Sequence, residues 1–232
     1  LTMKKMFMIL LLICFSTQWM NAQTMAFSAI EVKVKPFTQK DIKEAFEEVF
    51  EEVEMNKGAI VLERFTGGDS NGMTHRLVFL YTLGEKMIAD DFWASDKNAA
   101  FWAKMGNYIE DWGVSSSGRM MSWKEGNLET NPEVHIWNII PEDPAAFKAA
   151  HDKIVDEFKE EFKDRVVGFG TYDIGLPNGA THWVGLSGKD TIDHLMFYDK
   201  MEKNSRFAQL LKERGGYELT KDFSLKIIGN KQ

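Results

Sequence analysis

The sequence predicts an α+β protein made of two tandem βαββαβ repeats that pack sheet to sheet, and three observations lead to this fold class. Residues 71–75, Asn-Gly-Met-Thr-His, return as residues 178–182, Asn-Gly-Ala-Thr-His. Period-two and helical patterns of apolar residues follow one another in the same order in both halves of the chain. The offset between matching residues stays between 105 and 107 and changes only at loops. Agreement across three elements indicates an internal repeat.

The first repeat is expected over residues 27–125 and opens with a strand, because Ile30, Val32 and Val34 alternate with charged side chains. This alternation predicts one face on the core and one face in water. Thr38 can cap the helix that follows, in which apolar residues recur at helical spacing. The expected order is strand 30–34, helix 38–53, strand 59–65, a glycine-rich hairpin, strand 74–83, a helix capped by Ser95 or Asp96 that continues to Ile109, and strand 114–123.

The second repeat is expected over residues 133–230 and repeats this order. Asp143 and Pro144 supply a helix cap followed by the proline favoured at the first helical position. The apolar stripe of the first helix is kept, except that His151 takes the position of Phe46. The matched pairs are Ile42 with Phe147, Phe46 with His151, Val49 with Ile154, Val53 with Phe158 and Phe101 with Phe207, and the first strand is expected at residues 134–140.

A βαββαβ unit carries both helices on one face of its sheet, so its other face must be covered, and two copies can cover each other. This doubled unit resembles the dimeric α/β-barrel superfamily of the ferredoxin-like fold, which includes antibiotic-biosynthesis monooxygenase-like, stress-responsive barrel and chlorite-dismutase-like proteins. The resemblance spans residues 27–229 and rests on element order and spacing. It implies a cavity between sheet and helices that holds an apolar or aromatic ligand. It transfers no catalytic residue, and the ligand histidine of the haem-binding branch has no assignable counterpart.

The first 22 residues are typical of an export signal. Lys4 and Lys5 precede an apolar run, residues 6–15, that is too short to span a bilayer as a mature helix, and Ala22 can mark the cleavage site. The expected location is periplasmic or extracellular. Cleavage removes Cys14, the single cysteine, and changes the net charge from −7 to −9. The acidic mature chain favours neither nucleic acid nor a membrane as partner, and its oligomeric state is not predicted.

Six residues are candidates for a ligand-binding site. Alternation places His135 and Trp137 on one side of a strand, and the helix that follows carries His151 on its apolar stripe, so the three can meet in one cavity. His135 and His151 are also the candidates for a catalytic base, although both can instead be core histidines with satisfied hydrogen bonds. His194 is expected at the surface. The other three candidates are the aromatic residues Trp93, Trp102 and Trp183.

Other kinds of site have little support in the sequence. There is no His-x-x-x-His, Cys-x-x-Cys or Gly-x-Ser-x-Gly motif, so no metal site, cofactor or nucleophilic triad is expected. Gly168 and Gly170 lie within a predicted strand, where they are expected to admit a close neighbour. His75 and His182 are either paired functional groups or residues that hold their hairpins through side-chain hydrogen bonds.

These observations favour an exported protein that binds a small apolar or aromatic molecule in a cavity between sheet and helices. One alternative is a cofactor-independent monooxygenase-like enzyme that acts on small organic substrates. A second alternative is a structural or interaction module without a pocket, because packing of the two repeats can cover every apolar face.

Overall fold

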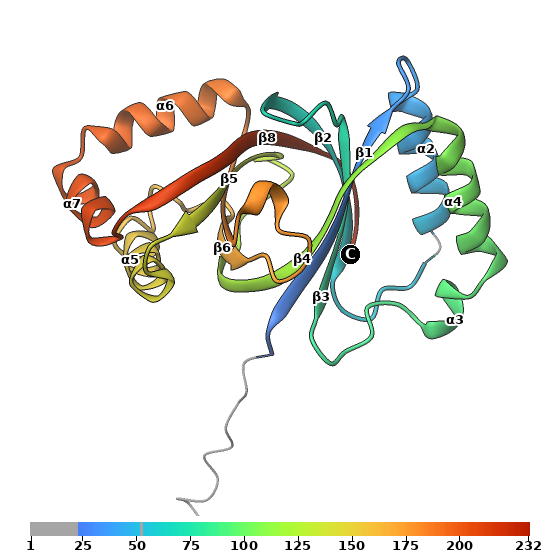
Figure 1. The fold of residues 1–232 in the computed structure, drawn as a ribbon, viewed down its shortest axis with the longest axis horizontal. Helices are drawn as coiled ribbons and strands as arrows, with labels where there is room; N and C mark the ends of the chain where they lie inside the picture. The colour runs from blue at the N-terminus through green and yellow to red at the C-terminus, as the bar shows by residue number, and fades with distance from the viewer. Residues whose placement is uncertain (1–22, 52) are drawn as a thin grey trace, which may run out of the picture.

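The computed structural model describes residues 23–51 and 53–232, and the predicted export signal, residues 1–22, lies outside the described residues. The chain is an α+β protein in which antiparallel strands form one closed barrel with helices on its outside (Figure 1). The strands are β1 (Met25–Val34), β2 (Ala59–Gly68), β3 (His75–Thr82), β4 (Ile109–Lys124), β5 (Glu133–Pro141), β6 (Val167–Thr171), β7 (His182–Gly188) and β8 (Tyr217–Lys231). The helices are α2 (Gln39–Phe50), α3 (Asp90–Trp93), α4 (Asp96–Tyr108), α5 (Pro144–Glu157), α6 (Thr191–Glu202) and α7 (Ser205–Glu213), with a short 3₁₀ turn η1 (Pro177–Gly179).

The barrel consists of two four-stranded halves that are joined edge to edge. Strand order is β4-β1-β3-β2 in the first half and β8-β5-β7-β6 in the second. β2 pairs with β8, and β4 pairs with β6. The sheet-to-sheet packing expected from the sequence takes the form of a closed barrel, in which the edges of the two halves bond to one another and satisfy backbone groups that an open edge leaves unpaired. The two inner faces therefore enclose one common interior.

The repeated pentapeptides form matching hairpins that meet each other. Asn71 and Asn178 have φ angles of 50° and 52°, and the glycine after each has a φ of 78° or 79°. Asparagine and glycine tolerate this left-handed conformation better than other residues, which explains their recurrence in both turns. The Asn71 amide Nδ2 donates a hydrogen bond to Asn178 Oδ1 at 3.1 Å. Two turns 107 residues apart are thus in direct contact.

The threonine and histidine that follow each turn make the same contacts in both halves. Thr74 Oγ1 lies 2.9 Å from His75 Nδ1, and Thr181 Oγ1 lies 2.8 Å from His182 Nδ1. The backbone N–H of Thr74 donates to the Val32 carbonyl, and that of Thr181 donates to the Ile139 carbonyl. These bonds tie the start of β3 to β1 and the start of β7 to β5. The geometry matches the structural interpretation of His75 and His182.

The helices form a separate layer on each side of the barrel (Figure 1). α2 and α4 cover the first half, where Phe50 packs against Phe46 and Phe101 with ring centroids 5.1 Å and 5.2 Å apart. All three rings are almost fully buried, so this layer is well filled. α5, α6 and α7 lie on the opposite side of the barrel, beside the second half.

The barrel interior is largely apolar but contains charged side chains towards the repeated hairpins. Glu31, Glu63 and Arg76 are each less than 9% exposed, and Arg76 Nε donates to Glu63 Oε2 at 2.6 Å. The alternation in β1 predicted that Glu31 faces water, and this was wrong because that face of β1 points into the barrel. Burial raises the pKa of Glu31, while Lys221 and Arg76 oppose the rise. A cavity of about 120 Å³ remains in the interior.

Two glycines of β6 make room for an indole in the barrel, as expected for strand glycines with a close neighbour. Replacing Gly170 with alanine should lower the free energy of unfolding by about 1–3 kcal/mol, because an added Cβ would lie 2.3 Å from the Arg119 carbonyl oxygen and 2.6 Å from the Trp183 ring. Gly106 in α4 is the control, since an added Cβ there meets no atom within 4 Å and alanine favours the helix. Urea-unfolding midpoints should fall for G170A and rise for G106A; an unchanged midpoint for G170A would contradict this packing.

Candidate functional site

A pocket of about 390 Å³ lies between the outer face of the second-half sheet and the helices α5, α6 and α7. His135 and Trp137 of β5, His151 of α5 and Tyr198 of α6 are among the residues that line it. The alternation of β5 turns His135 and Trp137 towards the helices and their neighbours towards the barrel interior. The structure thus brings together three of the residues that the sequence selected, His135, Trp137 and His151.

The pocket exists because four residues that fill the helix layer of the first half have counterparts in the second half that are smaller or less deeply buried. The first-half residues are each at most 2% exposed. Of their counterparts, all of which line the pocket, only His151 is buried, and the others are half-buried. Protein interiors rarely leave such space unfilled. The counterparts are His151 for Phe46, Val155 for Phe50, Phe207 for Phe101 and Leu211 for Met105.

The three remaining tryptophan candidates lie elsewhere. Trp183 faces the barrel interior, where its ring lies over Gly168 and Gly170 and forms an edge-to-face pair with Phe27. Trp93 and Trp102 line a shallow groove on the first half of the molecule. The six predicted site residues are therefore divided among three places. Both faces of the sheet are covered, and alternation alone does not tell which face contacts the helices and which faces the barrel interior.

His151 is the buried polar residue of the pocket whose hydrogen bonding is incomplete. It is 5% exposed, and its Nε2 has no hydrogen-bond partner among the described residues. Burial lowers the pKa of His151 to about 4, so its imidazole is neutral at physiological pH. The ring packs 5.7 Å from that of Phe169. The sequence left open that His151 is a core histidine with satisfied hydrogen bonds, and its Nε2 does not meet that expectation.

His135 belongs to a hydrogen-bonded chain along one wall of the pocket. Its Nδ1 lies 2.8 Å from the Tyr198 hydroxyl, and its Nε2 lies 3.2 Å from Asp222 Oδ2. The Tyr198 hydroxyl in turn lies 3.1 Å from His194 Nδ1. His194 Nε2 lies 3.2 Å from the Glu133 carbonyl oxygen, which can only accept. The chain thus runs from a carboxylate to a carbonyl through two imidazoles and a phenol.

This chain has an acceptor at each end, so its four contacts need four protons. Neutral His135, neutral His194 and Tyr198 together supply three. One contact therefore lacks a hydrogen at neutral pH, and one added proton on an imidazole completes the chain. Burial lowers the pKa of His135, and the Asp222 carboxylate opposes this shift. Burial likewise lowers the pKa of His194.

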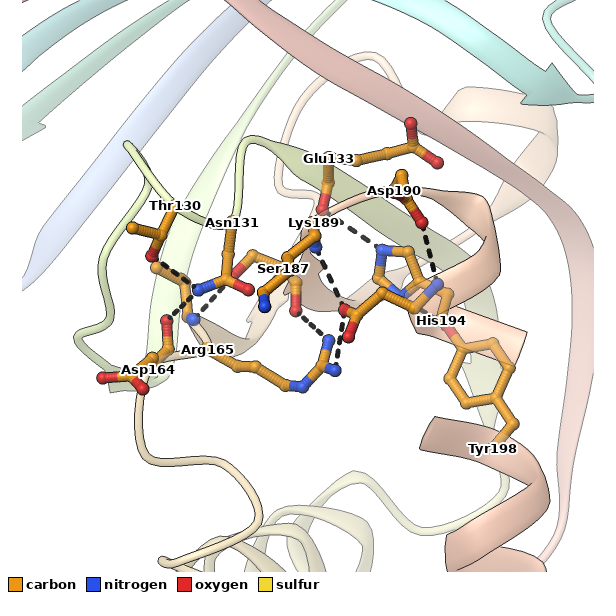
Figure 2. Close-up of polar contacts among 12 residues, drawn as sticks. Thr130, Asn131, Glu133, Asp164, Arg165, Ser187, Lys189, Asp190, His194 and Tyr198 are labelled. Carbon is orange, nitrogen blue, oxygen red and sulfur yellow. Dashed lines mark hydrogen bonds and ion pairs between the residues drawn. The ribbon is translucent and has the colours of Figure 1, made fainter. Parts of the chain in front are cut away.

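The start of α6, which carries His194, is anchored by a polar network that the sequence did not reveal (Figure 2). Asp190 caps the helix by accepting from the backbone N–H of Asp193 at 2.9 Å. Arg165 pairs with Asp193 at 2.7 Å and donates to the Ser187 carbonyl at 2.9 Å. The prediction that His194 is exposed was wrong, since it is 4% exposed. The network fixes the helix that carries Tyr198 into the pocket wall.

α6 itself was missed because apolar residues occur all around it. Ile192, Leu195 and Met196 are exposed, whereas Phe197 and Met201 are buried against the sheet. Such a helix lacks the one-sided stripe by which amphipathic helices are found. The Asp190-to-Asp193 spacing at its start was the available signal.

In residues 23–51 and 53–232, no group of three His, Cys, Asp or Glu side chains is arranged to hold a metal ion. None of the helices described is long and apolar enough to cross a membrane.

Comparisons with known proteins identify the fold. No protein-family model matches the sequence, and no curated protein matches it. Among solved structures, a presumed monooxygenase from Lactobacillus acidophilus matches with a TM-score of 0.61 and 10% identity over 90% of this chain and 97% of its own. A presumed monooxygenase from Fusobacterium nucleatum matches with a TM-score of 0.57 and 15% identity, covering 90% and 95%.

A third solved structure, an anthrone oxidase-like protein, matches with a TM-score of 0.52 and 8% identity over 90% of this chain and 93% of its own. Identities this low carry information on fold and not on activity. The three structural matches are consistent with a closed antiparallel barrel that has helices on its outside. The chain therefore has the fold of the dimeric α/β-barrel superfamily, as its resemblance to that superfamily indicated.

Proposed function

We propose that this chain is an exported protein that binds a small, mainly apolar or aromatic molecule in the pocket between the second-half sheet and α5–α7. The observation that carries the proposal is the contrast between the two helix layers. The first half fills its layer with Phe46, Phe50 and Phe101, whereas the second half keeps about 390 Å³ open beside aromatic and aliphatic walls. Ligand sites are typically apolar hollows with a few polar groups, and His135, His151 and Tyr198 supply such groups here.

We also infer that the two halves are tandem ferredoxin-like copies. The support comes from the matching strand orders, the paired φ angles of Asn71 and Asn178, and the matching Thr–His bonds. A duplication would explain how one copy could retain a filled helix layer while the other diverged into a pocket.

Filling the pocket should weaken ligand binding. The double variant His151→Phe and Val155→Phe copies Phe46 and Phe50 of the first half into the second. The fluorescent probe phenylnaphthylamine, which is neutral and aromatic, should bind the parent and bind the double variant at least about tenfold more weakly, because burying its rings in the pocket contributes more than 1.4 kcal/mol.

Trp93→Leu, which alters the groove on the first half, is the matched control and should leave probe binding unchanged. The proposal fails if the probe does not bind the parent. It also fails if the double variant, verified as folded by circular dichroism, binds the probe as the parent does.

A second candidate is an enzyme that oxygenates a small organic substrate without a cofactor, and the neutral imidazole of His151, whose Nε2 has no partner among the described residues, favours it. Both ring nitrogens of His135 already face partners, so direct proton abstraction falls to His151 Nε2. A base with a pKa of about 4 is weak at neutral pH. Oxygen consumption that depends on His151 and persists in His75→Gln would support the enzyme; substrate binding without turnover would not.

Haem is another occupant to test, because the superfamily has a haem-binding branch. His151 is the residue that would hold the haem iron, since its imidazole is neutral and its Nε2 has no partner among the described residues. Haem bound there would supply redox chemistry at its iron, and Trp137 would contribute an aromatic wall. A Soret band that appears on adding haemin to the parent and is lost in His151→Ala would support this occupant. Its absence from the parent would exclude it.

A further inference from the structure

Arg214 is a second unusual residue of the pocket wall, because no acidic side chain of the part of the chain that the structure describes forms an ion pair with it. Its guanidinium lies 4.6 Å from the ring centroid of Phe147 and 4.9 Å from that of Tyr217. Its Nε is buried and has no hydrogen-bond partner among the described residues. Burial lowers the pKa of Arg214, and only Tyr217 opposes the shift; no carboxylate does. The side chain remains cationic even so, because arginine is not deprotonated in proteins.

A half-buried cation whose Nε is shielded from water and has no counter-charge is costly to hold. The faces of Phe147 and Tyr217 offset part of this cost through cation–π attraction. They leave the Nε–H without an acceptor, and an unmet donor of a charged group costs more than a neutral one. A structure that keeps such a group beside an open pocket is stabilised when an anion enters.

His151 and Arg214 both line the pocket and are linked through two stacked rings. Arg214 lies over Phe147, whose ring stacks on that of Phe169 with centroids 5.1 Å apart, and the Phe169 ring lies 5.7 Å from that of His151. Among the described residues, five buried side-chain nitrogen or oxygen atoms lack a partner, and two of these are His151 Nε2 and Arg214 Nε. A guanidinium and an imidazole that carries its proton on Nε2 are both hydrogen-bond donors.

The pocket offers no internal anion for this role. Glu202 is the one acidic residue in its wall, and it is exposed at the end of α6. It is not among the groups that shift the pKa of Arg214. The remaining wall is dominated by aromatic and aliphatic side chains, so the part of a ligand beyond the acidic group must be apolar.

We propose that the pocket is specific for aromatic molecules that carry one acidic group, and that Arg214 binds this group, with His151 as a second hydrogen-bond donor. The proposal rests on the proposed function and adds to it the chemical class of the ligand. A carboxylate or sulfonate accepts from the guanidinium N–H groups of Arg214, while the rings lie against the apolar wall. Charge-assisted hydrogen bonds of this kind are roughly twice as strong as neutral ones.

Two fluorescent probes with the same aromatic body test this proposal. Anilinonaphthalene sulfonate carries an anionic group, and phenylnaphthylamine lacks it. The parent should bind the sulfonate probe more tightly than the neutral probe. Arg214→Gln should weaken binding of the sulfonate probe about tenfold, the scale expected for a lost bond to a charged group, and leave the neutral probe unchanged within about twofold.

Arg206→Gln is the matched control. Arg206 lies on α7, near Arg214 in the sequence, but pairs with Glu157 at the surface and does not line the pocket. Its loss should change neither affinity. Equal affinity of parent and Arg214→Gln for the sulfonate probe overturns the proposal but leaves the pocket as a binding site. Equal loss of both probes in Arg214→Gln also overturns it, because Arg214 would then only support the wall. Failure of the parent to bind either probe overturns the proposed function as well.

Discussion

Replacing His151 with phenylalanine should make the protein more stable at neutral pH and much less sensitive to acid. His151 has a pKa of about 4 in the folded protein, against about 6.5 for an unperturbed histidine. The unfolded chain therefore takes up a proton more readily than the folded one. The stability that depends on neutral His151 is fully present above about pH 6.5 and is lost as the pH falls from about 6.5 to 4. Below about pH 4, His151 causes no further loss. The loss amounts to about 3 kcal/mol.

Phenylalanine at this position removes the proton linkage and the unpaired Nε2, and it matches Phe46 of the first half. The free energy of unfolding should rise by about 1–2 kcal/mol at pH 7.5. The difference from the parent should then widen by about 3 kcal/mol at pH 4. Urea-unfolding curves at several pH values, followed by tryptophan fluorescence, measure both quantities.

His75 supplies the internal comparison for this experiment. It is fully buried, and burial lowers its pKa to about 4, with Arg64 adding to the shift. It remains in His151→Phe, so some acid sensitivity must persist in the variant. A variant that loses stability in acid as steeply as the parent would show that His151 is not held neutral by burial.

Arg76→Met should be among the most destabilising single substitutions in the barrel. It leaves the Glu63 carboxylate buried without its 2.6 Å partner, and removing one member of a buried pair costs about 3–5 kcal/mol. Glu31, whose pKa burial already raises, also loses a neighbouring positive charge. For a chain of this length, the thermal midpoint should fall by roughly 10 °C.

The double variant Glu63→Leu and Arg76→Met is the control for this prediction. It removes both charges at once and fills the space with apolar atoms, which is often neutral when a buried pair is replaced. Most of the stability lost in Arg76→Met should therefore return. Thermal and urea unfolding midpoints of the parent, the single variant and the double variant measure this recovery. A double variant as unstable as the single one would show that loss of the ion pair does not cause the destabilisation.

The fold could be predicted from the sequence because local patterns and the repeat agree with each other. Asp143 caps α5 and Ser95 caps α4 as expected, whereas Thr38 makes no side-chain cap bond to α2 and β4 begins at Ile109 instead of residue 114. The errors in the direction of strand side chains have a common origin. A barrel strand is covered on both faces, by the interior and by helices, so alternation does not identify a wet face. Glu31 and Trp183 were misplaced for this reason.

The candidate site was only partly predictable. His151 stood out because it interrupts an apolar stripe, and the alternation of β5 added His135 and Trp137. Arg214 and Tyr198 gave no such signal, since Arg214 follows the last residue of α7 and Tyr198 lies in α6, which has no one-sided apolar stripe. Their roles depend on tertiary packing of α6 and α7, which no local pattern encodes.

The two seams of the barrel, β2 with β8 and β4 with β6, have a consequence for assembly. Each half contributes one strand to each seam, and neither seam is the covalent linker that joins β4 to β5. Cutting the chain within that linker would leave all strand pairing in place. The connection between the halves thus sets their effective concentration rather than their geometry, and separately synthesised fragments have the complementary edges needed to reconstitute the molecule.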